Sequence, residues 1–131
     1  MSVDVGQLMS CIRKIERQLA TLRRIAAGGQ RQFNADAACG KILRAVARHY
    51  TLEDWMLTGS SRRVEICWPR HVAMYACHKL VGASQGTIAS TFHRFDHGTV
   101  LNALQRVQQR MESEPSAQAE VQAALDAARK P

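Results

Sequence analysis

The chain has 131 residues and a formal net charge of +7, with 18 Lys and Arg residues against 11 Asp and Glu residues. This length suits one compact domain with one or two added helices, and the positive charge favours nucleic acid over an anionic membrane surface as partner. No apolar run reaches the roughly 18 residues of a transmembrane helix, and no signal peptide is recognisable. Because the four cysteines are also widely spaced, the sequence predicts a cytoplasmic protein with no membrane partner.

Residues 1–29 are predicted to form an N-terminal helix with a coiled-coil pattern. Apolar residues alternate at spacings of three and four over three heptads, at Val5, Leu8, Ile12, Ile15, Leu19, Leu22 and Ala26. The helix is expected to end at Gly28-Gly29, before a linker over residues 28–34. Two interpretations stay open. The seam packs on the chain's own domain, or residues 5–26 join two chains in a homodimer, as the narrowness of the seam suggests.

Residues 30–114 are predicted to form one helical domain. A helix is expected from residue 35 to about residue 50, followed by a short helix over residues 51–57. The hydroxyl of Thr51 is expected to cap that short helix by accepting from the backbone N–H of Asp54. Residues 58–68 contain turn residues and paired arginines, and we expect an ordered basic loop there.

The second half of this domain has clear start and stop signals for helices. Pro69 is expected at the first position of a helix that ends at Gly82. Ser84 should then cap a short helix, and Asp96 should cap a long helix from residue 97 to about residue 113. Residues 115–131 are predicted to be an alanine-rich helical tail with weak apolar anchors, frayed at its end. The predicted fold class is all-α, a helix-turn-helix bundle with an added helix at each end.

Motifs for catalysis and metal binding are weak. Gly40-Lys41 lacks the rest of a phosphate-binding loop. His93 and His97, with Cys77-His78 upstream, would allow a zinc site, but the closely spaced cysteine pair of structural zinc sites is missing. Asp96 lies beside His97 without a nearby nucleophile. The sequence therefore predicts no enzyme, no cofactor, no metal and no bound nucleotide.

A nucleic-acid interface explains more of the sequence. In a helix-turn-helix, the N-terminal residues of the second helix face the major groove. His97 and Thr99 can contact base edges there, Gly98 permits a close approach, and Asp96 can cap the helix or accept from a cytosine amine. The flanking arginines would contact phosphates or the minor groove, and the candidates are Arg62, Arg63, Arg70 and Arg94.

Two segments, "SSRRVEICWPRHVAMYACHKL" and "IASTFHRFDHGTVLNALQRV", closely resemble the C-terminal DNA-binding domain of the bacterial replication initiator DnaA, over about residues 38–111. That family has an arginine-bearing loop, a Pro-Arg-Gln start to the next helix and a Gly-Gly-Arg-Asp-His-Thr-Thr-Val signature. The resemblance implies double-stranded DNA as partner, at sites of the DnaA-box type, and therefore a nucleoid-associated protein. It implies DNA contacts from Arg62, Arg63, Arg70, His71, His78, Ser84, Arg94, Asp96, His97, Gly98 and Thr99.

The chain departs from the family pattern at four places. His71 replaces the usual Gln, and His78 occupies a position where a Lys often contacts phosphate. The tripeptide His93-Arg94-Phe95 replaces Gly-Gly-Arg, and Gly98 replaces the first of two threonines. Gly98 lacks the threonine methyl group that could pack on a thymine methyl. A lost contact of this kind is worth roughly 1–3 kcal/mol of discrimination between bases, so we expect an altered sequence preference.

No ATPase module precedes the resembling segment, so the expected function is regulation of replication initiation or of transcription without ATP hydrolysis. The alternative is a protein-interaction module that keeps the initiator-like fold. In that case the N-terminal helix docks a partner, and DNA contact is weak.

Overall fold

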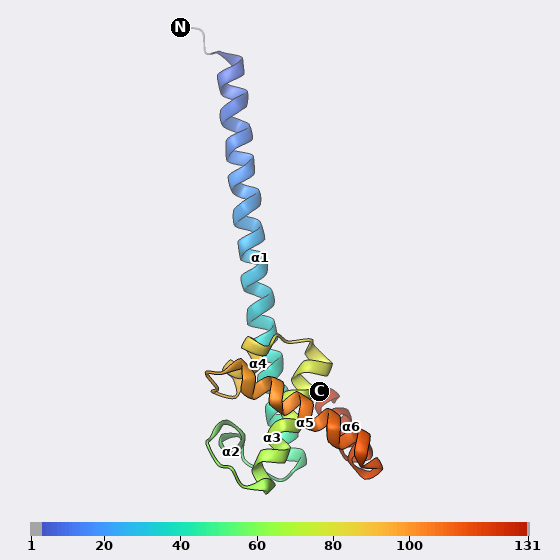
Figure 1. Cartoon of the computed structure of the whole chain (residues 1–131). Coiled ribbons are helices and arrows are strands. Elements are labelled where there is room, and N and C mark those ends of the chain that lie inside the picture. Colours follow the sequence, from blue (N-terminus) through green and yellow to red (C-terminus); the bar gives the residue numbers. More distant parts are fainter. Residues whose placement is uncertain (1–3, 131) are drawn as a thin grey trace. The chain divides into compact units, whose positions relative to one another are not determined.

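A computed structural model describes residues 4–130, except for the side chains of residues 30–33 (Figure 1). Every regular element in this range is helical, which confirms the predicted all-α class. None of these helices is both long and apolar enough to cross a membrane. The elements are α1 (Val5–His49), α2 (Asp54–Thr58), α3 (Val64–Ala76), the π-helical turn η1 (Cys77–Val81), α4 (Gln85–Thr91), α5 (His97–Ser113) and α6 (Pro115–Arg129).

The first helix is longer than expected. The predicted helix end at Gly28-Gly29 is wrong, because α1 continues through both glycines. A glycine inside a helix costs only about 1 kcal/mol relative to alanine, and no proline in this stretch removes a backbone donor. By its internal contacts, the chain divides into two units, Met1–Phe33 and Asn34–Pro131, and each is described by itself.

The first unit carries the heptad seam. Within residues 4–29, the large apolar side chains are all exposed, from 40% at Ile12 to 70% at Val5. Ile25, outside the a/d pattern, is exposed as well. A continuous apolar stripe on a charged helix is the usual signature of a surface that pairs with another helix.

The core of the second unit surrounds α3. This helix contacts α2, α5 and α6, and α4 packs on α5 (Figure 1). The largest fully buried side chains come from almost every element of the unit, and each contributes roughly 1.5–3 kcal/mol through its burial. They include Val46, Leu57, Val72, Met74, Ile88, Phe92, Val100, Val107 and Val121.

Two helix starts differ from the prediction. Thr51 does not cap a helix; its backbone is left-handed (φ 59°), and α2 begins only at Asp54, after Glu53. α3 begins at Val64, so Pro69 lies inside it and not at its first position. The earlier start is fixed by two backbone bonds, in which the N–H groups of Ile66 and Cys67 donate to the Arg63 carbonyl. The basic loop is therefore only residues 59–63.

The last helix is firmly packed, contrary to the expected frayed tail. α6 buries Ala117, Val121, Ala124 and Leu125, because small alanine side chains let the helix approach its neighbours closely. Its Glu120 carboxylate accepts from the Tyr50 hydroxyl at 2.9 Å and from the Trp68 indole at 2.7 Å. Burial first, and then this carboxylate, raises the pKa of Tyr50. α6 is thus an integral part of the domain.

Candidate nucleic-acid interface

The helix-turn-helix is formed by α4, the turn at residues 92–96 and α5. Ser84 caps α4 as predicted, its hydroxyl accepting from the Thr87 N–H at 3.1 Å. Phe92 is fully buried and anchors the turn, while His93 takes the left-handed conformation (φ 55°) that reverses the chain. The predicted Asp96 cap of α5 is also confirmed. Both helix caps of the helix-turn-helix were thus predictable from local sequence signals.

The first turn of α5 presents a small, exposed tip. The carboxylate of Asp96 accepts from the Gly98 N–H at 2.8 Å, and residues 95–99 are all exposed. A Cβ atom at position 98 would lie 3.1 Å from Asp96 Oδ1. Gly98 therefore gives the capping carboxylate room, besides reducing the bulk of the tip.

His97 lies against the start of α4. A Cβ atom built on Gly86 would come within 3.4 Å of His97 Nε2, so the imidazole ring is close to the Gly86 backbone. Thr99, one residue beyond Gly98, is exposed. Phe95 is fully exposed (105%), so burial in the core does not explain its presence. The tip thus combines an acceptor, an imidazole, a threonine and an unpacked aromatic ring.

Arg70 holds the basic loop and does not reach out from it. The residue is only 6% exposed, and its guanidinium donates to three backbone carbonyls: Leu57 and Ser61, each at 2.9 Å, and Met56 at 3.1 Å. Burial first, and then the charge of Arg94, lowers its pKa, although an arginine stays protonated. The sequence placed Arg70 among the DNA contacts; the structure gives it a positioning role.

Arg94 is the second arginine that holds the loop through a hydrogen bond. Its Nη2 donates to the Gly59 carbonyl at 2.6 Å, and its backbone N–H donates to the Ala89 carbonyl at 2.7 Å. The turn of the helix-turn-helix is thereby tied to the loop that carries Arg62 and Arg63. Both of those loop arginines are exposed, so they remain able to reach a ligand.

The two remaining histidine candidates lie away from the tip. His71 is half-buried on α3, where burial first, and then the charges of Arg106 and Arg70, lowers its pKa. His78 is exposed on η1 and shares a shallow depression with Leu104 and Gln108, about two turns further along α5 than the tip.

The candidate residues thus fall into three groups. Arg62, Arg63, Asp96, His97, Gly98 and Thr99 are exposed. Ser84, Arg70 and Arg94 make hydrogen bonds inside the domain, and His71 and His78 lie apart from the tip. Sequence reasoning missed the supporting role of the two arginines, because no local signal separates an inward-facing arginine from an outward-facing one. Within residues 4–130, no group of three His, Cys, Asp or Glu side chains is arranged to hold a metal ion.

Comparisons with known proteins agree with this geometry. The family described as "Bacterial dnaA protein helix-turn-helix" matches residues 39–107, more than half of the chain. The chromosomal replication initiator protein DnaA of Thermus thermophilus is 42% identical over 88 residues, which cover 67% of this chain and 20% of that protein. The protein of the same name from Bacteroides thetaiotaomicron is 36% identical over 81 residues. The chain therefore spans about a fifth of the length of these relatives.

Two solved structures share the fold. One, titled as the crystal structure of a DNA replication initiation factor, superposes with a TM-score of 0.69 at 23% identity and covers 89% of this chain and 36% of its own. Another, a replication initiator DnaA bound to AMPPCP and single-stranded DNA, gives a TM-score of 0.60 at 24% identity, over 88% of this chain and 37% of its own.

Proposed function

Because the chain belongs to the family of bacterial DnaA helix-turn-helix domains, we propose that it binds double-stranded DNA sequence-specifically, at sites similar to DnaA boxes. The observation that supports this most directly is the exposed first turn of α5, with Asp96 capping it, beside a basic loop fixed by two internal arginines. Helix N-termini of this kind enter the major groove.

Base reading is assigned to the tip. His97 can donate to a base acceptor, and the Thr99 methyl group can pack on a thymine methyl. Asp96 uses Oδ1 for the helix cap, which leaves Oδ2 as the acceptor for a cytosine amine. Because residue 98 is glycine, the helix can approach the base edges closely. We expect the preferred site to differ from a standard box at the base pair that faces this position.

Contact with the DNA backbone is assigned to the basic loop, which contains Arg62 and ends at Arg63. Arg70 donates a hydrogen bond to the Ser61 carbonyl of this loop, and Arg94 donates one to the Gly59 carbonyl. A fixed loop loses little conformational entropy on binding. Its two exposed arginines therefore suit the minor groove or the phosphates beside it.

The biological role we propose is regulation of replication initiation or transcription, by occupation of such sites in the cytoplasm. DNA binding by this surface requires no ATP hydrolysis. Residues 5–26 would join two chains through their exposed apolar seam, so that a homodimer could engage paired sites with increased avidity. The same exposed seam supports the second candidate, an interaction module whose first helix docks a partner protein.

Fluorescence anisotropy with a box-containing duplex and a matched random duplex tests the main proposal. We expect the box duplex to bind at least tenfold more tightly than the random duplex. The double variant His97→Ala with Thr99→Ala should lose most of this difference in affinity. Replacement of Arg62 and Arg63 should weaken binding to both duplexes and reduce the salt dependence. Equal, weak binding to both duplexes, unchanged by the tip variant, would favour the interaction module.

A further inference from the structure

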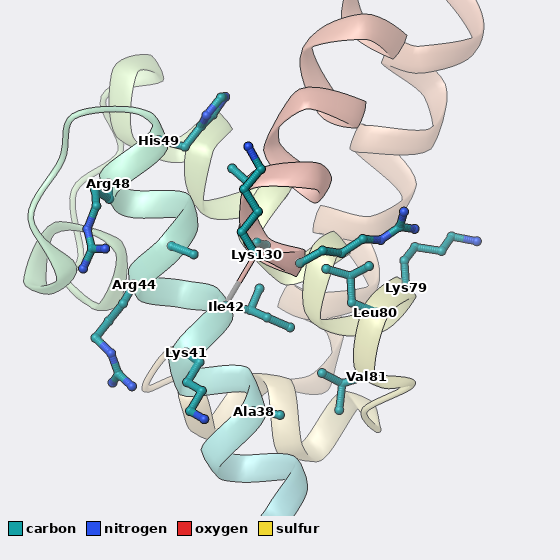
Figure 2. Close-up of a pocket in the computed structure, with 14 residues that line it drawn as sticks. Ala38, Lys41, Ile42, Arg44, Arg48, His49, Lys79, Leu80, Val81 and Lys130 are labelled. Atoms are coloured by element: carbon teal, nitrogen blue, oxygen red, sulfur yellow. The ribbon is translucent and has the colours of Figure 1, made fainter.

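A groove lies where the ends of α1, η1 and α6 meet (Figure 2). Its volume is about 960 Å³, and all of its lining residues belong to the second unit. Its floor is apolar: Ile42 and Leu80 lie near the middle of the view, with Val81 and Ala38 below them (Figure 2). The volume is at the upper end of the range of roughly 300–1,000 Å³ that is usual for ligand sites.

The rim of this groove is strongly basic. Among residues 4–130, no carboxylate lines it, whereas six lysines and arginines do. These are Lys41, Arg44, Arg48, Lys79, Arg129 and Lys130. Figure 2 shows Lys41 and Arg44 on the α1 side of the apolar floor and Lys79 across from them. All six residues are exposed, and Arg129 also pairs with Asp126 at 3.8 Å. Like charges gathered in this way create a positive potential that attracts an anionic ligand.

Helix ends explain only part of this charge. Basic residues in a last helical turn offset the negative end of the helix dipole, and Arg48, Lys79 and Arg129 occupy such turns. Lys41 and Arg44 do not, because α1 continues to His49. Their position beside the apolar floor is therefore not accounted for by helix stability.

The groove is also separate from the proposed DNA surface. None of its lining residues belongs to the basic loop (residues 59–63) or to the tip (residues 95–99). The proposed DNA-binding function therefore leaves it unused.

The chemistry of the groove favours a peptide over a nucleic acid. Single strands bind on aromatic platforms, but no Phe, Tyr or Trp lines the groove. Duplex interfaces are polar, whereas this floor is apolar. An apolar floor between basic rims complements an amphipathic helix that has one apolar face and acidic flanks. We propose that this groove binds an acidic amphipathic helix of a partner protein, with apolar side chains on Ile42, Leu80 and Val81 and carboxylates toward Lys41, Arg44 and Lys79.

The test uses the full chain and a labelled synthetic helix of about four turns, with Leu on one face and Glu elsewhere. A scrambled peptide of the same composition has no apolar face. At physiological salt we expect the amphipathic peptide to bind at least tenfold more tightly than the scrambled one, because charge alone does not use the floor. Equal affinities for the two peptides would overturn the proposal.

Charge-reversal variants localise the site. Lys41→Glu with Arg44→Glu should weaken peptide binding at least tenfold, while the ratio of box to random DNA affinity stays within about twofold. Arg13→Glu with Arg17→Glu changes the net charge equally, but in the first unit, and should leave peptide binding almost unchanged, because neither residue lines the groove. If circular dichroism shows that the first variant is unfolded, Lys41→Gln with Arg44→Gln replaces it.

Two further outcomes contradict the proposal. Equal losses in both charge-reversal variants would mean that the peptide responds only to net charge. The second outcome has two parts: a random duplex displaces the peptide, and the affinity of that duplex also falls in the Lys41 and Arg44 variant. This result would show that the groove binds nucleic acid. Because DNA specificity is read at the tip, either failure leaves the proposed function standing.

Discussion

The guanidinium of Arg94 donates a hydrogen bond to the backbone carbonyl of Gly59 at 2.6 Å, across 35 positions of sequence. This bond joins the turn of the helix-turn-helix to the basic loop, so that the two halves of the proposed DNA surface are held in one geometry. Arg70 holds the same loop from inside the domain. Preorganisation of this kind reduces the entropy cost of binding.

Replacement of Arg70 should destabilise the domain and not only its DNA binding. Arg70→Ala would leave three backbone carbonyls without their charged donor, at a cost of about 3 kcal/mol in the free energy of unfolding. Urea unfolding followed by circular dichroism measures this loss. Arg70→Lys should recover only a small part, because a lysine cannot reproduce the fork geometry. If Arg70→Ala lowered DNA affinity at unchanged stability, a direct DNA contact would be the better explanation.

Replacement of Arg94 should loosen the position of the basic loop relative to the tip, because it removes the hydrogen bond to the Gly59 carbonyl. In Arg94→Ala we expect the box duplex to lose more affinity than the random duplex, because the loop and the tip are no longer held in register. Anisotropy titrations at several salt concentrations check this. A phosphate contact would behave differently, with equal loss for both duplexes and a salt slope lower by about one.

Gly98 should set part of the sequence preference. Gly98→Thr adds a methyl group and a hydroxyl to the tip, and we expect it to change the preference at one base pair by roughly 1–3 kcal/mol, or up to about a hundredfold. Selection from random duplexes measures the shift. Gly98→Ala is the matched control, since it brings the same Cβ close to Asp96 without the new contact groups. Identical selected sequences for all three proteins would show that position 98 does not face a base.

Phe95 should contribute to DNA affinity without contributing to stability. Its ring is fully exposed, so Phe95→Ala should leave the unfolding midpoint unchanged. An aromatic ring at the DNA surface can stack or wedge against bases, and we expect several-fold weaker duplex binding after its removal. Phe95→Tyr should retain most of the affinity. Unchanged binding by Phe95→Ala would show that the ring points away from the DNA.

His71 should make stability depend on pH. Its pKa is lowered in the folded chain, so between that value and the ordinary value near 6.5 the unfolded chain binds more protons. The free energy of unfolding should therefore fall as pH falls below about 6.5. In His71→Gln, urea unfolding between pH 7 and pH 5 should show a shallower decline. An unchanged pH dependence would contradict this role.

The heptad seam should control association. Ile12→Lys with Leu19→Lys puts two charges into the exposed apolar stripe, and sedimentation should show a change from dimer to monomer. Lys14→Glu, a charge change outside the seam, serves as the control and should leave the dimer intact. A wild-type chain that sediments as a monomer would exclude the homodimer.

Local signals predicted much of the helix-turn-helix. The caps at Ser84 and Asp96 and the stop at Gly82 were all confirmed, because each depends on hydrogen bonds or backbone angles within a few residues. The end at Gly28-Gly29 and the cap at Thr51 were wrong. The glycines are surrounded by residues that favour helix, so the helix continues through them. At Thr51, the packing around residues 50–57 overrode the weak capping signal.

The sequence by itself determined the helical class, the position of α5 and the residues of its first turn, since periodicity and capping act within one or two helical turns. Only the tertiary structure decided which arginines face outward. Arg62 and Arg63 are exposed, whereas Arg70 and Arg94 donate to carbonyls that lie far from them in sequence. The basic groove between α1, η1 and α6 likewise exists only once distant segments pack together. The physical reason is that both features depend on contacts between segments far apart in the sequence: the fold sets which acceptors a long charged side chain can reach, and it sets which helices pack together to form a groove.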